Sequence, residues 1–489
     1  MTVAIVTSKD KSIACKLHHK RIRAPINLAA LSEVFAGRKS ASILGGNASK
    51  ANADRFSYWA AEPRDIFEFR AGQQNPLQKL HRTLRRYTLE KGQKDAVPKG
   101  IFRGGWIGYF SYELARYIER LPATTTDDLE MPLVRLCFYD RFIAYDHVDR
   151  TFWLVALDLP GDTEEPEDKL AGLENLVAES QRVHVEPPVA ADLDRIDFSA
   201  IRSNMSKDYY LRAIAKIKRY IYDGDIYQVN FSQRFECDFD GRPIDLFHWQ
   251  NRYNPSPYAA YIDAGQHYIV SASPEMFITI RDGVISTKPI KGTRPRINNP
   301  PQSQQINEKN FNELLTSEKE QAELNMIIDL ERNDVAKICV PGTRKVVQPR
   351  TIESYPTVFH AVATVAGQLR RQATFCDILK ATFPGGSITG APKIRSMEII
   401  DETEPTARGV YTGSIGFIGI DGTVSLNIAI RTIIIAGQKA YAQTGGGIVA
   451  DSDPQAEWQE TITKARALLA GIRATQDARP KIKRINSKH

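Results

Sequence analysis

A β-hairpin pattern near the middle of the chain constrains the fold more than any other feature. Two alternating runs, 276–280 and 284–288, flank an Asp-Gly turn, and a further strand candidate spans 268–272. Strands joined by so short a turn run antiparallel, because a parallel crossover needs a dozen residues or more. The sequence therefore predicts an antiparallel hairpin. The alternation ends at Pro289, where we expect the chain to leave the sheet.

A lysine follows this predicted strand end. Lys291 precedes Gly292, and a glycine lets a ligand approach the backbone closely. A lysine in that setting is a candidate nucleophile or anion binder. The alternative is an exposed loop lysine, since most lysines lie on the surface. The local pattern leaves both interpretations open.

Length and composition exclude several classes of protein. A chain of 489 residues predicts two or three domains, or one large composite fold. No apolar run approaches the ~20 residues of a membrane span, and the first residues do not form a signal peptide. The five cysteines lie far apart with no Cys-x-x-Cys, which argues against disulfides or zinc and favours a reducing cytoplasm.

The net charge of +7 does not indicate nucleic-acid binding. Five lysines and arginines and no acidic residue lie in 478–489, which leaves +2 for the rest of the chain. A nucleic-acid site would place basic residues on a folded face instead. We therefore expect no nucleic-acid partner and a basic, poorly structured tail over 473–489.

The composition along the chain predicts how it divides into domains. Residues 1–25 are polar and basic, and we expect them to be poorly ordered. A linker composition at 187–191 predicts a boundary between a unit at 26–195 and a second at 200–472. The elements that matter below are predicted helices at 77–89 and 308–338 and predicted strands at 135–145, 151–157, 424–435 and 439–443.

Two pairs of glutamates have the spacing of neighbours on a helix face. Glu320 and Glu323 lie in the predicted helix 308–338, and Glu457 and Glu460 follow a helix start at Asp453. Two such pairs can chelate a hard divalent cation, and with oxygen donors alone Mg²⁺ is the natural choice. The alternative is two solvated helix faces.

Other residues are candidates for holding an anion. Gly445, Gly446 and Gly447 follow the predicted strand 439–443 and offer backbone N–H groups, unless they form a flexible turn. Arg431 can pair with a carboxylate in bidentate geometry if it points inward.

These motifs together resemble one known family, the chorismate-utilising enzymes. The motifs that carry the resemblance follow one another at 224–230, 273–275, 289–296, 322–334, 390–393 and 445–453. The match is dense over about 200–472, the chorismate-binding catalytic domain, and looser over about 26–155, which resembles the N-terminal domain of anthranilate synthase component I. The resemblance implies an α+β fold in which two large antiparallel β-sheets pack as a central sandwich with helices outside.

Two positions separate the branches of the family. Lys291 stands where anthranilate and isochorismate synthases have alanine, and it resembles the lysine with which aminodeoxychorismate synthases attack C2 of chorismate and expel the C4 hydroxyl. Gln228 stands where isochorismate and salicylate synthases have a water-activating lysine, and a neutral amide is no such base. The resemblance therefore implies amination of chorismate at C4 by ammonia, for p-aminobenzoate and folate biosynthesis.

The other roles come from the same resemblance. Glu275 is the expected general acid and base, with a pKa raised by burial, whereas Lys291 needs a neutral amine. Glu323 and Glu460 are expected to hold Mg²⁺ directly, and Glu320 and Glu457 through water. The expected substrate-binding residues are Gly292, Thr293, His360, Thr389, Lys393, Tyr411, Arg431, Gly445, Gly446 and Gly447.

The expected partners are chorismate, ammonia and a separate glutaminase. No cysteine lies in the Gly-x-Cys-x-Gly elbow of a glutamine amidotransferase, so ammonia is expected from another subunit or from free ammonium. Two alternatives stay open. One is an anthranilate synthase component I with an unusual lysine, and the other is a basic binding protein that has lost catalysis.

Overall fold

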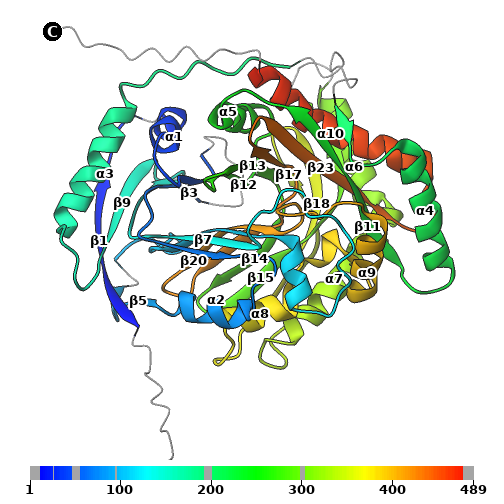
Figure 1. Ribbon diagram of the computed structural model, residues 1–489, viewed down its shortest axis with the longest axis horizontal. Helices are drawn as coiled ribbons and strands as arrows, with labels where there is room; N and C mark the ends of the chain where they lie inside the picture. Colours follow the sequence, from blue (N-terminus) through cyan, green and yellow to red (C-terminus); the bar gives the residue numbers. More distant parts are fainter. Residues whose placement is uncertain are drawn as a thin grey trace, which may run out of the picture.

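Two large β-sheets form the centre of the molecule in the computed structural model, and helices lie around them (Figure 1). The structure describes residues 12–25, 27–46, 55–93, 96–191, 201–297 and 303–476. Strand pairings between the named strands are antiparallel except for one parallel pair near the N-terminus. The α+β sandwich that the sequence predicts is confirmed.

The larger sheet has 13 strands. Their order is β10 (Arg202–Ser203), β11 (Gln228–Asp238), β23 (Lys439–Ile448), β22 (Thr432–Ala436), β13 (His267–Ser273), β12 (Tyr258–Asp263), β2 (Ser42–Leu44), β3 (Phe56–Ala60), β8 (Arg141–Asp146), β9 (Thr151–Asp158), β1 (Ile13–Ile22) and β5 (Tyr87–Leu89), with β19 (Gly390–Ala391) beside β11.

The second sheet has 10 strands. Their order is β16 (Ile290–Pro295), β18 (Val358–Gln368), β15 (Val284–Lys288), β14 (Met276–Arg281), β21 (Val424–Asn427), β20 (Ser414–Gly419), β6 (Gly105–Phe110), β7 (Val134–Tyr139) and β4 (Asp65–Phe69), with β17 (Lys345–Ser354) beside β18. The predicted hairpin is β14 and β15, and it lies near the middle of this sheet.

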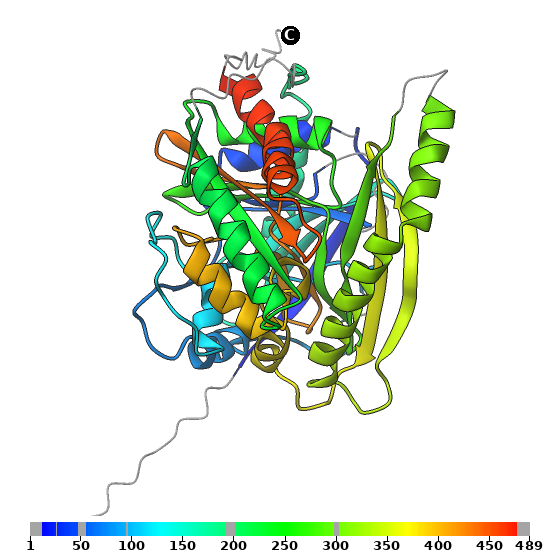
Figure 2. The same ribbon diagram turned by 90° about the vertical axis from the view of Figure 1, so that its right-hand side faces the viewer.

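The helices begin at residues that suit a helix N-terminus. Ser206 and Ser317 each accept a hydrogen bond from a backbone N–H of the first turn. The helices are α1 (Leu28–Ala36), α2 (Pro76–Leu84), α3 (Pro166–Ser180), α4 (Lys207–Tyr222), α5 (Pro243–Tyr253), α6 (Ser303–Thr316), α7 (Glu318–Ala336), α8 (Phe375–Thr382), α9 (Lys393–Thr403) and α10 (Pro454–Gln476). In Figure 2, α4 (green) and α10 (red) lie side by side. No described helix is long and apolar enough to cross a membrane.

The main core lies between the two sheets. Tyr58 of β3 meets Phe417 of β20 edge to face with 5.6 Å between the ring centroids, which joins the sheets directly. A second apolar cluster lies on the other face of the 13-stranded sheet, where α1, α3, α5 and α10 cover it. Both faces of this sheet are therefore buried.

The two halves of the chain share both sheets. Strands before residue 160 lie in each sheet beside strands after residue 225, and the main apolar cluster draws on both halves. The predicted boundary near residue 195 therefore does not separate two cores.

Several predicted elements are wrong at their ends. The predicted disordered segment 1–25 contains β1, in which Cys15 and Leu17 are buried while polar residues alternate with them; residues 1–11 lie outside the described part of the chain. The predicted helix 77–89 ends at Leu84, because the chain turns there into β5.

Two predicted elements are each two elements. The predicted strand 135–145 breaks at Asp140, and its halves, β7 and β8, belong to different sheets. The predicted helix 308–338 breaks at Ser317, which caps α7, so α6 is a separate helix. The predicted tail 473–489 begins inside α10, which runs to Gln476, and its remainder lies outside the described residues.

Candidate active site

Glu275 and Lys291 come together at the end of the predicted hairpin. Glu275 lies directly before β14, where its carbonyl accepts a hydrogen bond from the N–H of Ile428, and its side chain is buried. Its Oε1 accepts a weak hydrogen bond, 3.5 Å long, from the backbone N–H of Ile290. The neighbouring residue in the chain is Lys291. This contact places the carboxyl close to the lysine.

Lys291 lies on a strand and not in a loop. The prediction that the chain leaves the sheet at Pro289 is wrong, because β16 pairs with β18 from Ile290 onward. The Lys291 amine donates a hydrogen bond of 3.2 Å to the carbonyl of Ser387. A carbonyl that accepts one amine proton leaves the nitrogen lone pair free to point elsewhere. The contact therefore orients a potential nucleophile.

Burial shifts the two pKa values in opposite directions. Desolvation raises the pKa of Glu275, and the Ser387 hydroxyl and Lys291 oppose the shift. Desolvation lowers the pKa of Lys291, and Glu275 and Glu323 oppose that shift. Both shifts favour the uncharged forms, a protonated acid and a neutral amine. These directions agree with the roles that the sequence predicts.

The first pair of glutamates lies at the start of α7. Glu320 Oε1 accepts a hydrogen bond of 2.7 Å from Arg294, while its Oε2 is buried and has no partner among the described residues. Gly292 lies against this carboxylate, and a Cβ there would be 2.9 Å from Oε2. Gly292 also has a φ of +89°, so a side chain is excluded twice over.

The second pair lies at the start of α10. Ser452 donates to Glu457 Oε1 over 2.7 Å, and Glu460 pairs with Lys464 over 2.7 Å. Desolvation and the nearby Glu460 both raise the pKa of Glu457. A Cβ on Gly446 would lie 3.0 Å from Glu457 Oε2, so this glycine keeps the carboxylate close to β23.

The two pairs approach the lysine from different helices. Glu323 and Glu460 both act on the pKa of Lys291. Among the described residues, however, no three His, Cys, Asp or Glu side chains gather into a metal-binding group. Arg294 and Lys464 each hold one of the four carboxylates. All the donor atoms of the four glutamates are oxygens, and the buried Oε2 of Glu320 lacks a partner among the described residues. This donor chemistry fits Mg²⁺, although the carboxylates are not gathered into a cluster.

Arg431, which is expected to hold a carboxylate, has an unusual backbone conformation. The prediction of one long strand around Arg431 is wrong, because β21 ends at Asn427 and β22 begins at Thr432. Arg431 lies between the two strands with a left-handed φ of 49°. Its side chain makes no ion pair with any described residue. An unpaired, desolvated guanidinium is suited to bind an anion.

The three glycines lie inside β23 and not in a turn after it, so the prediction of a strand ending at residue 443 is wrong. A Cβ on Gly445 would lie 2.7 Å from the carbonyl oxygen of Phe231, and one on Gly447 would lie 2.2 Å from Gln228 Nε2. Gln228 is buried, and its Oε1 has no partner in the described part of the chain. Close packing against β11 therefore explains Gly445 and Gly447, and the approach of Glu457 explains Gly446.

His360 and Tyr411 are buried. The His360 Nδ1 and the hydroxyl of Thr293 are 2.8 Å apart, while Nε2 has no partner among the described residues. Burial, aided by the charge of Arg431, lowers the pKa of His360 to about 3, so the ring is neutral. The ring of Tyr411 lies beside the guanidinium of Arg408, whose carbon is 5.9 Å from the ring centroid.

Thr389 and Lys393, both expected to bind substrate, already have partners within the protein. The Thr389 hydroxyl donates to the carbonyl of Gly385 over 2.9 Å. Lys393 pairs with Asp334 and donates to two backbone carbonyls. Within the described part of the chain, no hydrogen bond or ion pair joins either side chain to Lys291.

The structure adds residues that the sequence interpretation did not single out. Ser387 accepts a hydrogen bond from Lys291 through its carbonyl, and its hydroxyl acts to lower the pKa of Glu275. Lys464 pairs with Glu460 and donates to the carbonyl of Gly445 over 2.9 Å. Lys464 follows Glu460 by four residues on one helix, a spacing that could have revealed it. Glu331 is also buried, and desolvation raises its pKa to about 8 while Thr287 donates to it.

Comparisons with known proteins agree with this geometry. The model of the family described as chorismate binding enzyme matches residues 47–470. A protein of Klebsiella aerogenes named aminodeoxychorismate synthase component 1 is 40% identical over 395 residues, which cover 81% of this chain and 82% of that protein. A Pseudomonas aeruginosa protein named anthranilate synthase component 1 is 39% identical over 375 residues, which cover 76% and 75%.

A solved structure has the same fold. The crystal structure of anthranilate synthase component I from Streptococcus pneumoniae superposes with a TM-score of 0.73 at 29% sequence identity, over 86% of this chain and 93% of that one. Relatives with two different names are thus nearly equally similar in sequence. Overall similarity does not choose between their reactions.

Proposed function

The chain belongs to the chorismate binding enzyme family, and from that premise we propose that it aminates chorismate at C4 to give 4-amino-4-deoxychorismate. The observation that supports this reaction over others in the family is the position of Lys291, whose amine is oriented by Ser387 and lies beside Glu275. A relative named aminodeoxychorismate synthase component 1 agrees with it.

The first step is attack by Lys291. Its neutral amine forms a bond to C2 of chorismate, the ring double bonds shift, and the C4–O bond breaks. Glu275 donates the proton that lets the hydroxyl leave as water. Desolvation supports both roles, because it favours the neutral amine and the protonated acid that this step requires.

The second step releases the lysine. Ammonia forms a bond to C4, the double bonds shift back, and the C2–N bond to Lys291 breaks. Glu275, now ionised, takes a proton from the incoming nitrogen and returns to its starting state. The balance is chorismate plus ammonia giving 4-amino-4-deoxychorismate plus water.

The remaining residues bind and orient the substrate. Arg431 and Tyr411 would hold the enolpyruvyl carboxylate with the backbone of Gly446 and Gly447. Glu323 and Glu460 would hold Mg²⁺ directly, and Glu320 and Glu457 through water. When bound, the cation supplies positive charge for the ring carboxylate. Gln228, a neutral amide, disfavours water as the nucleophile.

The ammonia would come from a separate amidotransferase. The chain lacks the Gly-x-Cys-x-Gly elbow of that class, and the relatives are named as component 1. We propose that this second protein, or ammonium in its absence, supplies the nucleophile for p-aminobenzoate and folate biosynthesis.

The second candidate is anthranilate synthesis, which the 39% identical relative supports. One assay separates the two: the purified chain is incubated with chorismate, Mg²⁺ and ammonium, and the product is identified by chromatography and mass. We expect 4-amino-4-deoxychorismate. Anthranilate as the main product would contradict the proposal, and absence of any turnover would favour a binding protein without catalysis.

A further inference from the structure

The loop 383–389 carries Ser387, the residue whose carbonyl accepts the Lys291 amine. The loop joins α8 to β19 and contains two consecutive glycines, Gly385 and Gly386. A short glycine-containing loop has many accessible conformations unless contacts hold it. The orientation of Lys291 therefore depends on what fixes this loop.

Buried groups of β11 and of the turn after α9 hold the second end of the loop. Asn230 donates through its backbone N–H to the carbonyl of Thr389 over 2.8 Å, and through its amide to that of Ile388 over 3.1 Å. Arg408, which is 2% exposed, also donates to the Ile388 carbonyl over 3.1 Å. This end is firmly attached to the core.

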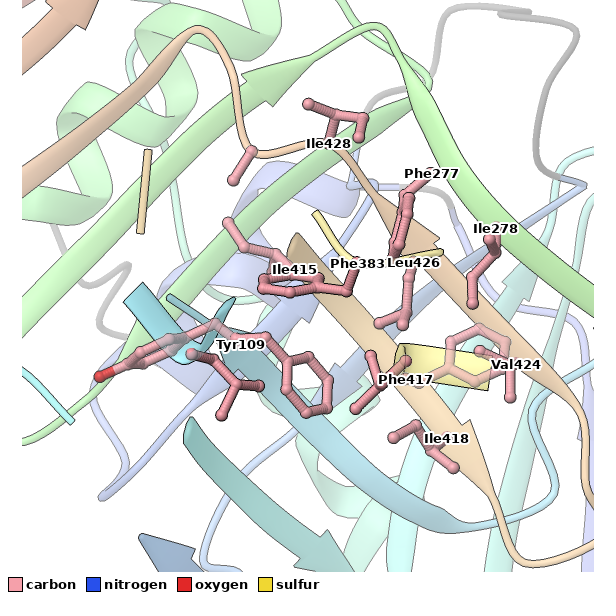
Figure 3. Packing of buried hydrophobic residues seen from close by; sticks show 14 of the residues in the cluster. Tyr109, Phe277, Ile278, Phe383, Ile415, Phe417, Ile418, Val424, Leu426 and Ile428 are labelled. Carbon is pink, nitrogen blue, oxygen red and sulfur yellow. The ribbon is translucent and has the colours of Figure 1, made fainter. Parts of the chain in front are cut away.

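One lysine side chain holds the first end, together with the backbone hydrogen bond from the Phe383 N–H to the carbonyl of Leu379 over 2.8 Å. The Lys393 ammonium donates to the carbonyls of Thr382 over 3.0 Å and Pro384 over 2.8 Å, and it forms an ion pair with Asp334 of α7. The two side chains of the pair are 14% and 5% exposed. Between the two carbonyls lies Phe383, which packs in the core with its ring centroid 5.9 Å from that of Phe277 (Figure 3).

Packing alone does not fix the middle of the loop. A cavity lies beside it, lined by Thr382, Gly385 and Gly386 from the loop side and by Glu331 and Asp334 from α7. The cavity leaves unfilled space beside Thr382 and Gly385, whereas Gly386 itself packs against α7, where a Cβ would lie 2.7 Å from the Leu330 side chain. The ion pair spans this gap, because Asp334 is on α7 and Lys393 reaches the loop carbonyls.

We propose that Lys393 and Asp334 form a clasp that holds the loop 383–389 so that Ser387 orients the Lys291 amine. In this account Lys393 is a positioning residue, although the sequence alone suggested a substrate contact. The inference rests on the proposed function in that it takes Lys291 to be the nucleophile. A misplacement of about 1 Å at a reacting group lowers a rate by roughly a hundredfold.

The variant Lys393→Met tests the clasp. It leaves the Thr382 and Pro384 carbonyls without their donor, yet Asp334 keeps a second partner, Lys337, at 3.0 Å. The buried carboxylate is therefore not left alone, which favours folding of the variant. If the variant does not fold, Asp334→Asn serves instead, because the amide keeps a hydrogen-bond acceptor for Lys393 and removes only the charge.

The matched control is Lys337→Met. This lysine contacts the same carboxylate but is 54% exposed and has no contact with the loop. For all variants, kcat is measured from consumption of chorismate, whatever the product. The Kd of chorismate is measured by calorimetry with Mg²⁺ present, for each change combined with Lys291→Ala so that no adduct forms. Thermal unfolding is recorded beside them.

We expect Lys393→Met to lower kcat by about ten- to a hundredfold with the Kd of chorismate changed less than about twofold. Lys337→Met should keep the parent values. A raised Kd with unchanged kcat would overturn the proposal and indicate a substrate contact instead. An equal loss of kcat in both variants, or no loss of kcat in Lys393→Met, would also overturn the proposal. An anthranilate product would refute the proposed reaction and leave this comparison valid, because consumption is the quantity followed.

Discussion

At the scale of single residues, burial shifts the pKa values of Glu275 and Lys291 toward the protonation states that the proposed chemistry needs. Desolvation is the largest cause for each, raising the pKa of the acid and lowering that of the amine. The charges of the two groups oppose these shifts, so apparent pKa values belong to the pair. A pH profile can therefore report on both groups.

The first prediction concerns that profile. Single-turnover formation of the Lys291 adduct is followed without ammonia and with saturating Mg²⁺. The rate should rise with pH as Lys291 loses its proton, at a lower pH than for a free lysine. It should fall again as Glu275 ionises, at a higher pH than for a free carboxyl.

The control for this profile is Glu275→Gln, which keeps the shape but has no proton to give. The rate should drop by about 10²–10⁴-fold, and the falling limb should disappear. A falling limb that persists in this variant would assign it to another group.

Spacing and residue type could reveal only part of the site. The glutamate pairs follow from helical spacing, and Lys291 and Glu275 from the motifs around them. Ser387 contributes a backbone carbonyl to Lys291, and any residue type carries one, so no pattern marks it. Lys393 has the charge of an anion ligand, and only the structure shows that Asp334 and two carbonyls already engage it.

At the scale of elements, α7 and α10 each place a carboxylate pair in the first turns of a helix. The second prediction is that Glu323→Gln and Glu460→Gln each raise the Mg²⁺ concentration needed for half-maximal turnover by more than about tenfold. Each change removes one negative charge where the substrate is itself an anion. The control is Glu318→Gln, the same change at an exposed position in the first turn of α7. Mg²⁺ titrations that overlay the parent in both site variants would remove these glutamates from the metal site.

The third prediction concerns β23. The variant Gly447→Ala places a methyl group 2.2 Å from Gln228 Nε2, so Gln228 or the strand must shift. We expect a loss of roughly 1–3 kcal/mol in the free energy of unfolding, measured by urea denaturation. Gly172→Ala is the control, because a Cβ at this helical position meets no atom within 4 Å. A Gly447→Ala variant as stable as the parent would show that the glycine is not required by packing.

Strands and helices were easier to predict than their ends. The periodicity over 308–338 is continuous across Ser317, so only the cap reveals that α6 and α7 are separate. The alternation over 135–145 likewise continues through Asp140, although the chain passes there from one sheet to the other. A pattern of buried residues does not say which sheet buries them.

At the scale of the whole molecule, the halves of the chain form one sandwich. Strands from both halves alternate in each sheet, and such pairing between distant segments leaves no trace in local composition. The Pro-rich linker composition therefore predicted a domain boundary near residue 195, although the apolar cores extend across it. The overall α+β architecture was predictable only through the family resemblance.

The fourth prediction concerns the source of ammonia. The purified chain should turn over chorismate with ammonium salts, and activity at fixed total ammonium should rise with pH below the falling limb, because ammonia replaces ammonium. Glutamine should support turnover only after a separate amidotransferase is added. Glutamine-dependent turnover by the single chain would contradict the proposed partnership.

If Lys291 forms a bond to C2 of chorismate, the adduct can be detected by intact-mass measurement. The protein is mixed with chorismate and Mg²⁺ without ammonia, quenched in acid, and weighed beside Lys291→Ala and Lys291→Arg. We expect a mass increase of chorismate less one water in the parent, mapped to the peptide with Lys291, and none in either variant. An arginine variant that makes the 4-amino product at the parent rate, with no adduct in any protein, would contradict the formation of this bond.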